Sequence, residues 1–322
     1  MIFLGVVSSP FQLMCLNEYL ILNNVKNYTI LSYYDSQKEK SQLKEVINFL
    51  SLKNVRLIKA VKGFQYIYPY LFYYNKKIDT LIIGNYFTRI HRLYQKLLKS
   101  KRVILVDDGS ISLNLKNSFK YNKVSNPYGN TNRIDEILGI ENHFKFEIFT
   151  IFNLKPNKYF SVYSNELSYV RAKVKKFKKE KSIVIIGQPL VEKKFTDVKC
   201  YMDYLSTISK KFDGYNIFYF PSRKESVENI LNIQKRFGFS IKNSEINIEL
   251  YLIKYGILPD KIIGITTSAL FSLSKIFEKI QINTNISFYR LKNFKNISYS
   301  IFSKKVYKEF EKFGIKELKW KF

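Results

Sequence analysis

The order of short apolar runs and helical segments is the feature that most constrains this fold. In residues 1–165, apolar runs of strand length alternate with segments of helical spacing. This alternation is typical of a parallel sheet with helical crossovers. The predicted strands are 2–7, 28–34, 55–61, 79–85 and 102–109, and the predicted helices are 11–22, 38–52 and 87–100. The first half therefore predicts a Rossmann-like lobe, although it lacks the Gly-x-Gly-x-x-Gly signature of dinucleotide binding.

The same alternation restarts after a lysine-rich segment, residues 166–182, which is predicted to be a solvated helical connector. The second set of predicted strands is 183–189, 215–221 and 261–267, and the predicted helices are 201–211, 226–238 and 268–277. The chain is thus expected to form two Rossmann-like lobes, 1–165 and 183–322, with a central cleft. This α/β architecture is that of the GT-B glycosyltransferases.

The chain is strongly basic, with 54 Lys and Arg against 26 Asp and Glu and a net charge of +28. Such charge predicts attraction to polyanions, which include nucleic acids, anionic membranes, nucleotide sugars and acidic glycans. AT-rich coding would also enrich Lys, Ile, Asn, Tyr and Phe, so charge alone does not choose among these partners. No nucleic-acid-binding signature is present, and the basic residues are spread over the chain, which disfavours nucleic acid.

The cysteines and the hydropathy pattern bear on the compartment. Cys15 and Cys200 lie in different halves without metal or redox spacing, so both are expected to be reduced packing residues. Residues 1–14 carry no basic n-region, and no apolar run approaches the ~20 residues that span a bilayer. A cytoplasmic protein is expected, either soluble or peripheral at the membrane.

The first candidate site follows the strand that ends near residue 106. Asp107, Asp108 and Gly109 stand there, and ligands of open α/β sheets bind beyond the carboxyl ends of strands. A carboxylate on a rigid strand end can act as a general base toward an acceptor hydroxyl. An Asx-type turn that caps the next segment is the alternative.

The second lobe has strand-end motifs of its own. Gly187, Gln188 and Pro189 leave one strand, and Glu192 follows closely enough to be a second candidate base. After the next strand, Arg223 and Lys224 are suited to phosphate.

Two further patterns in the second lobe concern helix starts. Ser222 with Glu225 has capping-box spacing. Thr266, Thr267 and Ser268 open an apolar helix, so hydroxyls and backbone N–H groups would converge on a bound phosphate.

These motifs carry a family likeness. The chain resembles glycosyltransferase family 52 and the related bacterial polysialyltransferases, which make lipooligosaccharide and capsule. The matching segments are 9–13, 107–109, 187–190, 219–225, 247–252 and 264–271. The resemblance implies an inverting, metal-independent enzyme without a cofactor that transfers sialic acid from CMP-sialic acid to a surface glycan.

The resemblance also implies roles for residues, with the acceptor in the N-terminal lobe and the donor in the C-terminal lobe. The catalytic candidates are Asp108, Asp107, Glu192 and Ser222. The donor-binding candidates are Ser9, Gly109, Gly187, Gln188, Pro189, Arg223, Glu249, Thr266, Thr267 and Ser268.

Two positions depart from the family pattern. Ser222 stands where relatives have a histidine, and Leu190 where some have an aspartate. Serine cannot act as a general acid near neutral pH as histidine can. A catalytically impaired homologue that binds partners in polysaccharide assembly is therefore the alternative function. His91 and His143 are expected to be surface or capping residues.

The C-terminal segment 303–322 is basic and has an apolar stripe. The stripe consists of Val306, Phe310, Phe313 and Leu318, beside Trp320. One interpretation is an amphipathic helix on an anionic membrane surface. The other is a helix that docks the same stripe on its own lobe.

Overall fold

The computed structural model describes residues 2–119, 124, 133–174, 177–242, 246–278 and 285–319. The chain divides into two compact units. The N-terminal lobe is Met1–Val170 with Glu245–Asn247, and the C-terminal lobe is Arg171–Ser244 with Ile248–Phe322. The expected central cleft between the lobes stays a prediction.

The N-terminal lobe is built on a seven-stranded sheet in the order β3-β2-β1-β4-β5-β6-β7. Neighbouring strands are parallel throughout. The strands are β1 Phe3–Val7, β2 Tyr28–Tyr34, β3 Val55–Lys59, β4 Thr80–Ile83, β5 Arg102–Val106, β6 Phe146–Thr150 and β7 Phe160–Ser164. The helices are α1 Pro10–Leu22, α2 Gln37–Leu50, α3 Phe64–Tyr73, α4 Arg89–Leu97, the 3-10 helix η1 Gly109–Asn114, α5 Leu115–Ser118 and α6 Arg133–Ile137. α7, Ser168–Ala172, lies at the boundary between the lobes.

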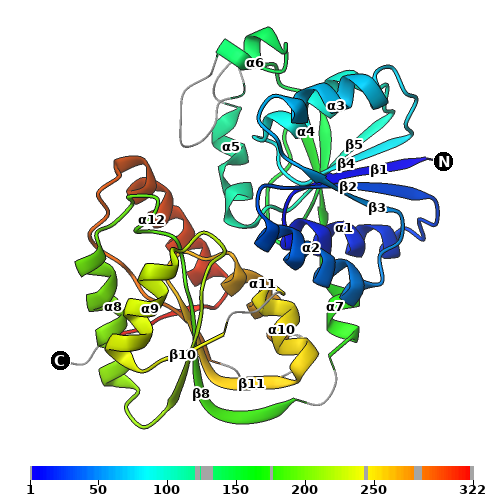
Figure 1. Ribbon diagram of the computed structural model, residues 1–322. Coiled ribbons are helices and arrows are strands. Elements are labelled where there is room, and N and C mark those ends of the chain that lie inside the picture. Colours follow the sequence, from blue (N-terminus) through cyan, green and yellow to red (C-terminus); the bar gives the residue numbers. More distant parts are fainter. Residues whose placement is uncertain are drawn as a thin grey trace. The chain divides into compact units, whose positions relative to one another are not determined.

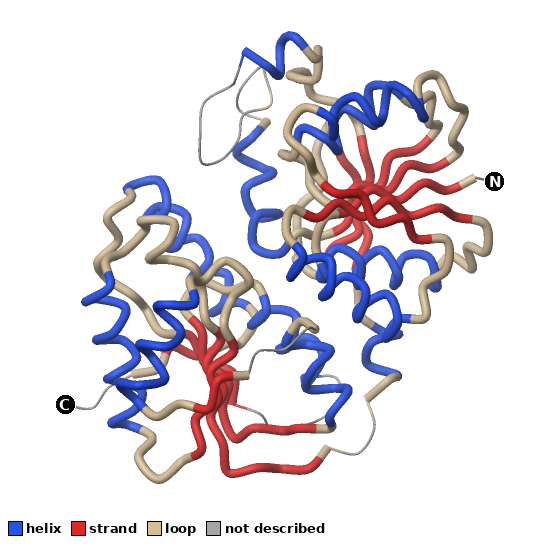
Figure 2. The backbone as a smooth tube through the Cα atoms, viewed as in Figure 1, coloured by secondary structure: helices blue, strands red, loops and turns tan. Residues whose placement is uncertain are grey.

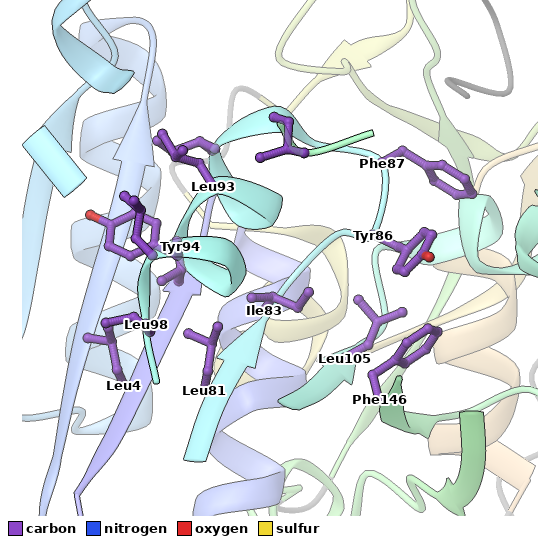
Figure 3. Close-up of a cluster of buried hydrophobic side chains, with 14 of the residues drawn as sticks. Leu4, Leu81, Ile83, Tyr86, Phe87, Leu93, Tyr94, Leu98, Leu105 and Phe146 are labelled. Atoms are coloured by element: carbon purple, nitrogen blue, oxygen red, sulfur yellow. The ribbon is translucent and has the colours of Figure 1, made fainter. Parts of the chain in front are cut away.

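The middle of this sheet is apolar on both faces because helices cover both. β1 and β4 are buried along their whole lengths. Figures 1 and 2 show α1 and α2 on one face and α3 and α4 on the other. On the second face, Leu93 and Tyr94 of α4 belong to one buried cluster with Leu81 and Ile83 (Figure 3). Burial of this kind is the main source of a lobe's stability.

The C-terminal lobe repeats the topology. Its six-stranded sheet has the order β10-β9-β8-β11-β12-β13, and its neighbouring strands are parallel. The strands are β8 Lys178–Ile186, β9 Asn216–Phe220, β10 Ser240–Ile241, β11 Ile257–Gly264, β12 Asn285–Phe288 and β13 Lys316–Glu317. The helices are α8 Val198–Lys211, α9 Val227–Phe237, α10 Ile248–Tyr255, α11 Ala269–Glu278 and α12 Ile297–Lys312. Counted within its own lobe, the C-terminal sheet has the strand order 3-2-1-4-5-6, and the N-terminal sheet has the same order with a seventh strand added after the sixth.

The prediction of two Rossmann-like α/β lobes is confirmed, but the predicted connector helix over 166–182 is wrong. α7 ends at Ala172, and β8 begins at Lys178. Residues 178–180 pair with residues 257–259 of β11. Backbone pairing with β11 extends the strand into a lysine-rich segment whose composition favours a solvated helix.

The C-terminal helix docks on its own lobe. Val306 and Phe310 of α12 are fully buried, and Phe310 packs against Phe271 of α11 with ring centroids 4.4 Å apart. The stripe therefore faces the core and is not available to a membrane, while Trp320 lies outside the described residues. Among the described residues, no helix combines the length and hydropathy needed to span a bilayer.

Candidate active site

Each sheet has one point where the chain reverses its direction of winding. In the N-terminal lobe it lies between β1 and β4, and in the C-terminal lobe between β8 and β11. Helices that follow these strands cover opposite faces of the sheet, as Figure 1 shows for both lobes. Ligands of open α/β sheets bind beyond the carboxyl ends of the strands at such a switch point. The predicted site residues lie just after the carboxyl ends of β1, β5, β8, β9 and β11, except for Glu249, which lies inside α10.

In the N-terminal lobe, Asp108 is held by two side-chain amides. Its Oδ1 accepts a hydrogen bond from Gln12 Nε2 at 2.6 Å, and its Oδ2 accepts one from Asn85 Nδ2. The three residues come from the start of α1, the end of β4 and the end of β5. Gln12 and Asn85 are buried, while Asp108 is half-buried. The arrangement fixes a carboxylate at the switch point and leaves part of it accessible.

Local sequence explains where Gln12 lies. Ser9 caps α1 by accepting a hydrogen bond from the Gln12 backbone N–H at 3.2 Å, and Pro10 occupies the first helical position. Gln12 Oε1 accepts a hydrogen bond from the Ser8 backbone N–H at 2.7 Å. A side chain at Gly84 would collide with the Gln12 amide. Ser9 therefore acts on the helix start, and Gly84 leaves room for Gln12.

A buried histidine supports Asn85 from behind. The Asn85 backbone N–H donates to His91 Nδ1 at 2.9 Å, and Asn85 Oδ1 accepts from the Phe87 N–H at 2.7 Å. Burial lowers the pKa of His91 to about 4, so its ring is neutral at pH 7, and Nδ1 also lies 3.2 Å from the Asn85 carbonyl oxygen. The expected surface or capping position is thus wrong for His91, because α4 turns this residue into the core.

His143 also departs from its expected position. It is half-buried, and its ring stacks on Tyr86 with centroids 6.2 Å apart. Its Nδ1 is 2.8 Å from the Tyr86 hydroxyl. His143 therefore packs among aromatic side chains, in contact with Tyr86, Phe119 and Tyr159.

The two neighbouring aspartates have different surroundings. Asp107 is fully buried, and it accepts hydrogen bonds from Thr150 Oγ1 at 2.7 Å and from the Ile151 N–H at 2.6 Å. It thereby ties the end of β5 to the end of β6. Gly109 has φ +66°, a conformation that disfavours side chains, and it lets the chain turn into η1 directly after Asp108.

In the C-terminal lobe, Gln188 and Thr266 join the ends of β8 and β11. Gln188 Nε2 donates to Thr266 Oγ1 at 3.0 Å, and the Thr266 backbone N–H donates to Gln188 Oε1 at 2.8 Å. Thr266 Oγ1 is also 2.6 Å from the hydroxyl of Tyr299 in α12. These two predicted donor-binding residues therefore contact each other, and their two hydrogen bonds join the loops that follow β8 and β11.

A chain of hydroxyls links the same loop to Glu225. The Gln188 backbone N–H donates to the Tyr201 hydroxyl at 3.2 Å, and the Tyr201 and Tyr219 hydroxyls are 2.9 Å apart. Tyr219 donates to Glu225 Oε1, and the Ser222 backbone N–H donates to Oε2. Burial raises the pKa of both tyrosines. The backbone of Ser222 is thus held by the buried Glu225 carboxylate, for which the sequence predicted only a role in a helix cap.

Gly187 directly follows β8 and lies beside the Tyr219 hydroxyl and the Glu225 carboxylate. A side chain at Gly187 would collide with Glu225 and Tyr219. Pro189 follows, and its carbonyl accepts the Lys193 N–H at 3.1 Å. The Gly-Gln-Pro motif therefore shapes a tight turn at the end of β8.

Glu192 caps a helix. Its Oε1 accepts hydrogen bonds from the Ser226 N–H and from Asn229 Nδ2, both at 2.8 Å. Ser226, not Ser222, is the N-cap of α9. Arg223 is half-buried in the turn between β9 and α9.

The start of α11 offers a place for an anion. Thr267 and Ser268 precede the helix and are half-buried. Helix N-termini present unpaired N–H groups and the positive end of the helix dipole. Glu249 lies deeper, where it accepts a hydrogen bond from Ser272 Oγ at 2.6 Å and so ties α10 to α11. The hydroxyls before α11 are therefore better placed for a ligand than Glu249.

Lys193 of this lobe was not among the predicted site residues, whereas Lys224, together with Arg223, was expected to face phosphate. Loss of hydration, with repulsion from Lys224 added, lowers the pKa of Lys193. An anion between two ammonium groups would relieve this repulsion. The signal in the sequence was their placement, since Lys193 follows the turn after β8 and Lys224 the turn after β9. In the described part of the chain, no group of three or more His, Cys, Asp or Glu residues is arranged to hold a metal ion.

No protein family and no curated protein sequence matches the chain. Solved structures do resemble it. A Neisseria meningitidis UDP-GlcNAc 2-epimerase bound to UDP-GlcNAc matches with TM-score 0.55 and 11% identity, covering 97% of this chain and 91% of the other. Staphylococcus aureus MnaA, solved with UDP, matches with TM-score 0.54 and 11% identity, covering 97% and 89%. A Listeria monocytogenes protein assigned as a UDP-N-acetylglucosamine 2-epimerase matches with TM-score 0.57 and 9% identity, covering 97% of this chain and 87% of the other.

These findings correct the family expected from the motifs. The resemblance to glycosyltransferase family 52 and the polysialyltransferases is wrong, and so are CMP-sialic acid as donor and sialic acid transfer as function. The physical reason is that short Ser, Thr and Gly motifs at strand ends recur wherever a doubly wound sheet turns into a helix. Without that family, Ser222 no longer stands for a lost histidine, and the impaired-homologue alternative loses its basis. What the likeness to solved structures shows is the fold, in which two parallel α/β lobes form a chain of the GT-B type.

Proposed function

We propose that this protein is an enzyme that transfers a sugar from a UDP-sugar to an acceptor hydroxyl. The observation that carries the proposal is the Asp108 carboxylate, which two amides fix at the switch point of the N-terminal lobe while leaving it half-buried. A general base must be rigid and reachable, and Asp108 is both. The fold similarity to proteins solved with UDP or UDP-GlcNAc supports UDP as the nucleotide.

The C-terminal lobe is proposed to bind the nucleotide. Thr267 and Ser268 at the start of α11 would donate hydrogen bonds to the diphosphate, and Lys193 would face its charge. The Gln188–Thr266 pair would hold the β8 and β11 loops in register for this contact, because both of its hydrogen bonds cross the switch point. Diphosphate is strongly anionic, so helix N–H groups, hydroxyls and ammonium groups complement it.

In the proposed reaction Asp108 accepts the proton of the acceptor hydroxyl. The acceptor oxygen forms a bond to the anomeric carbon as the bond between that carbon and the diphosphate oxygen breaks. The electron pair leaves with UDP, where the start of α11 stabilises the added negative charge. Gln12 and Asn85 keep the carboxylate in one orientation, and an ionised oxygen is the better acceptor for their N–H groups.

Epimerisation of UDP-GlcNAc at carbon 2 is the second candidate. It is favoured by the fold similarity to UDP-GlcNAc 2-epimerases over 97% of the chain. That reaction must remove a hydrogen from carbon, for which a carboxylate held by two hydrogen-bond donors is poorly suited. Sugar transfer requires the same base to remove a proton from a hydroxyl, which is more acidic than a C–H group, so transfer is the first candidate.

One experiment separates these activities. The protein is incubated with UDP-GlcNAc, with and without a panel of sugar acceptors, and UDP release and nucleotide-sugar products are followed by anion-exchange chromatography. Acceptor-dependent UDP release that disappears in Asp108→Asn supports transfer. Formation of UDP-N-acetylmannosamine without acceptor supports epimerisation. Absence of both, together with no UDP binding, would contradict a UDP-sugar enzyme.

A further inference from the structure

Helix α3 turns large apolar side chains toward solvent. Phe64, Ile67 and Leu71 lie at spacings of three and four residues, so they share one stripe of the helix, and their exposed fractions are 48%, 51% and 66%. Tyr74, the C-cap residue of α3, is 61% exposed, and Tyr70 and Phe72 of the same helix are 40% and 48% exposed. The opposite side of α3 packs inward through Pro69 and Tyr73, which are buried. α3 therefore has an apolar inner face and an apolar outer stripe, and only the inner face is used by the fold.

The surroundings of this stripe are positively charged. Residues 46–78 contain no Asp or Glu. Lys59 and Lys62 precede α3, Lys76 and Lys77 follow it, and all four are exposed. Lys76 Nζ also lies 5.1 Å from the centroid of the Tyr73 ring, which keeps this charge beside the helix. An apolar stripe with ammonium groups at both ends is complementary to a surface with apolar depth and anionic head groups.

We propose that the outer stripe of α3 docks on an anionic lipid surface. Phe64, Ile67 and Leu71 would enter the boundary between head groups and acyl chains, and the flanking lysines would contact lipid phosphates. Tyr74 suits the same boundary, because its ring is apolar and its hydroxyl polar. With 10 residues, α3 is too short to span a bilayer, so it lies on the surface.

Charge also argues against a second copy of the chain as the occupant. A symmetric dimer through α3 would bring the same lysines of both copies together, and like charges across an interface oppose association. A lipid surface presents the opposite charge. The inference is independent of the proposed enzymatic activity, since it uses no residue of the switch points.

The test is co-sedimentation of the full chain with vesicles. Vesicles of phosphatidylglycerol and phosphatidylcholine are compared with vesicles of phosphatidylcholine alone, at low and high salt. The parent protein should bind the anionic vesicles, and binding should fall with salt. Ile67→Ser/Leu71→Ser should lower the bound fraction at least about tenfold, since it removes two apolar anchors. Lys76→Gln/Lys77→Gln should weaken binding and flatten its salt dependence.

The matched control is Val227→Ser/Ile297→Ser, which removes two apolar side chains that are 73% and 78% exposed in the C-terminal lobe. It should bind vesicles as the parent does. Thermal unfolding of each variant, compared with the parent, checks that the fold is kept. The proposal is overturned if the parent does not sediment with anionic vesicles or if the α3 variant binds as well as the parent. A dimer in sedimentation velocity that Ile67→Ser/Leu71→Ser abolishes, without vesicle binding, would also overturn it and assign the stripe to a second copy.

Discussion

The two lobes share one topology but differ at their switch points. In the N-terminal lobe a carboxylate, Asp108, stands at this point and is held by amide donors. In the C-terminal lobe the corresponding position between β8 and β11 is bridged by the uncharged Gln188–Thr266 pair, and the start of α11 lies beside it. The first arrangement repels phosphate and suits a hydroxyl proton, whereas the second suits phosphate. The same strand order therefore supports opposite electrostatics, and the proposed division of labour follows from that difference.

The largest expected effect concerns the two aspartates after β5. Asp108→Asn should lower turnover of the UDP-sugar by about 10²- to 10⁴-fold, the usual contribution of a general base. Asp107→Ala should instead lower the free energy of unfolding by about 3 kcal/mol, because two buried donors lose a charged acceptor. Steady-state kinetics and urea unfolding of both variants measure these effects. If Asp108→Asn keeps full activity, the Asp108 carboxylate is not the general base.

His91 allows the N-terminal cluster to be tested through pH. The pKa of His91 falls from its ordinary 6.5 to about 4 because of burial, so the unfolded chain binds this proton more tightly than the folded chain. Stability is therefore complete above about pH 6.5 and declines as the pH falls toward 4, by about 3 kcal/mol from this group.

His91→Asn is the control, since its Oδ1 can replace Nδ1 as acceptor for the Asn85 N–H. Urea unfolding between about pH 7 and about pH 4 should show a shallower decline for this variant than for the parent. An equal decline in both proteins would mean that His91 is already solvated in the folded state.

Two glycines allow the lobes to be compared directly, because Gly84 leaves space for Gln12 in the N-terminal lobe and Gly187 leaves space for Glu225 and Tyr219 in the C-terminal lobe. Gly84→Ala should displace Gln12 from Asp108, and Gly187→Ala should displace Glu225 and Tyr219. Each should cost about 1–3 kcal/mol, as overpacking usually does. Turnover should fall in Gly84→Ala with UDP affinity kept, and UDP affinity should fall in Gly187→Ala. Calorimetric titration with UDP and steady-state kinetics on both proteins give the comparison, and the reverse pattern would exchange the roles of the lobes.

The sequence predicted well where the strands end, but it did not predict which side chains hydrogen-bond to the residues at those ends. Asp108 and Thr267 were located because apolar runs end just before them, and a run has a visible length. Gln12 and Asn85 were not chosen as site residues, since their contact with Asp108 joins positions 96 and 23 residues apart and depends on the strand order. Asn85 ended a predicted strand, and that was the available signal.

Two other features were hidden for different reasons. Strand β8 begins in a lysine-rich segment because of backbone pairing with β11, which a local pattern does not contain. The sequence also did not predict that apolar side chains of α3 are exposed, because an apolar segment of this composition usually indicates a buried element. The family was misassigned because its motifs are short and recur at the strand ends of many doubly wound sheets.

The division of labour between the lobes is tested most directly by calorimetric titration of UDP into two variants and the parent protein. Thr267→Ala/Ser268→Ala should weaken UDP binding by about 1–3 kcal/mol, the range expected for hydrogen bonds to a charged group. Asp108→Asn should bind UDP within about threefold of the parent, because the base acts on the acceptor. Unchanged affinity in the double variant, or loss of affinity in Asp108→Asn, would contradict the assignment of nucleotide and base to different lobes.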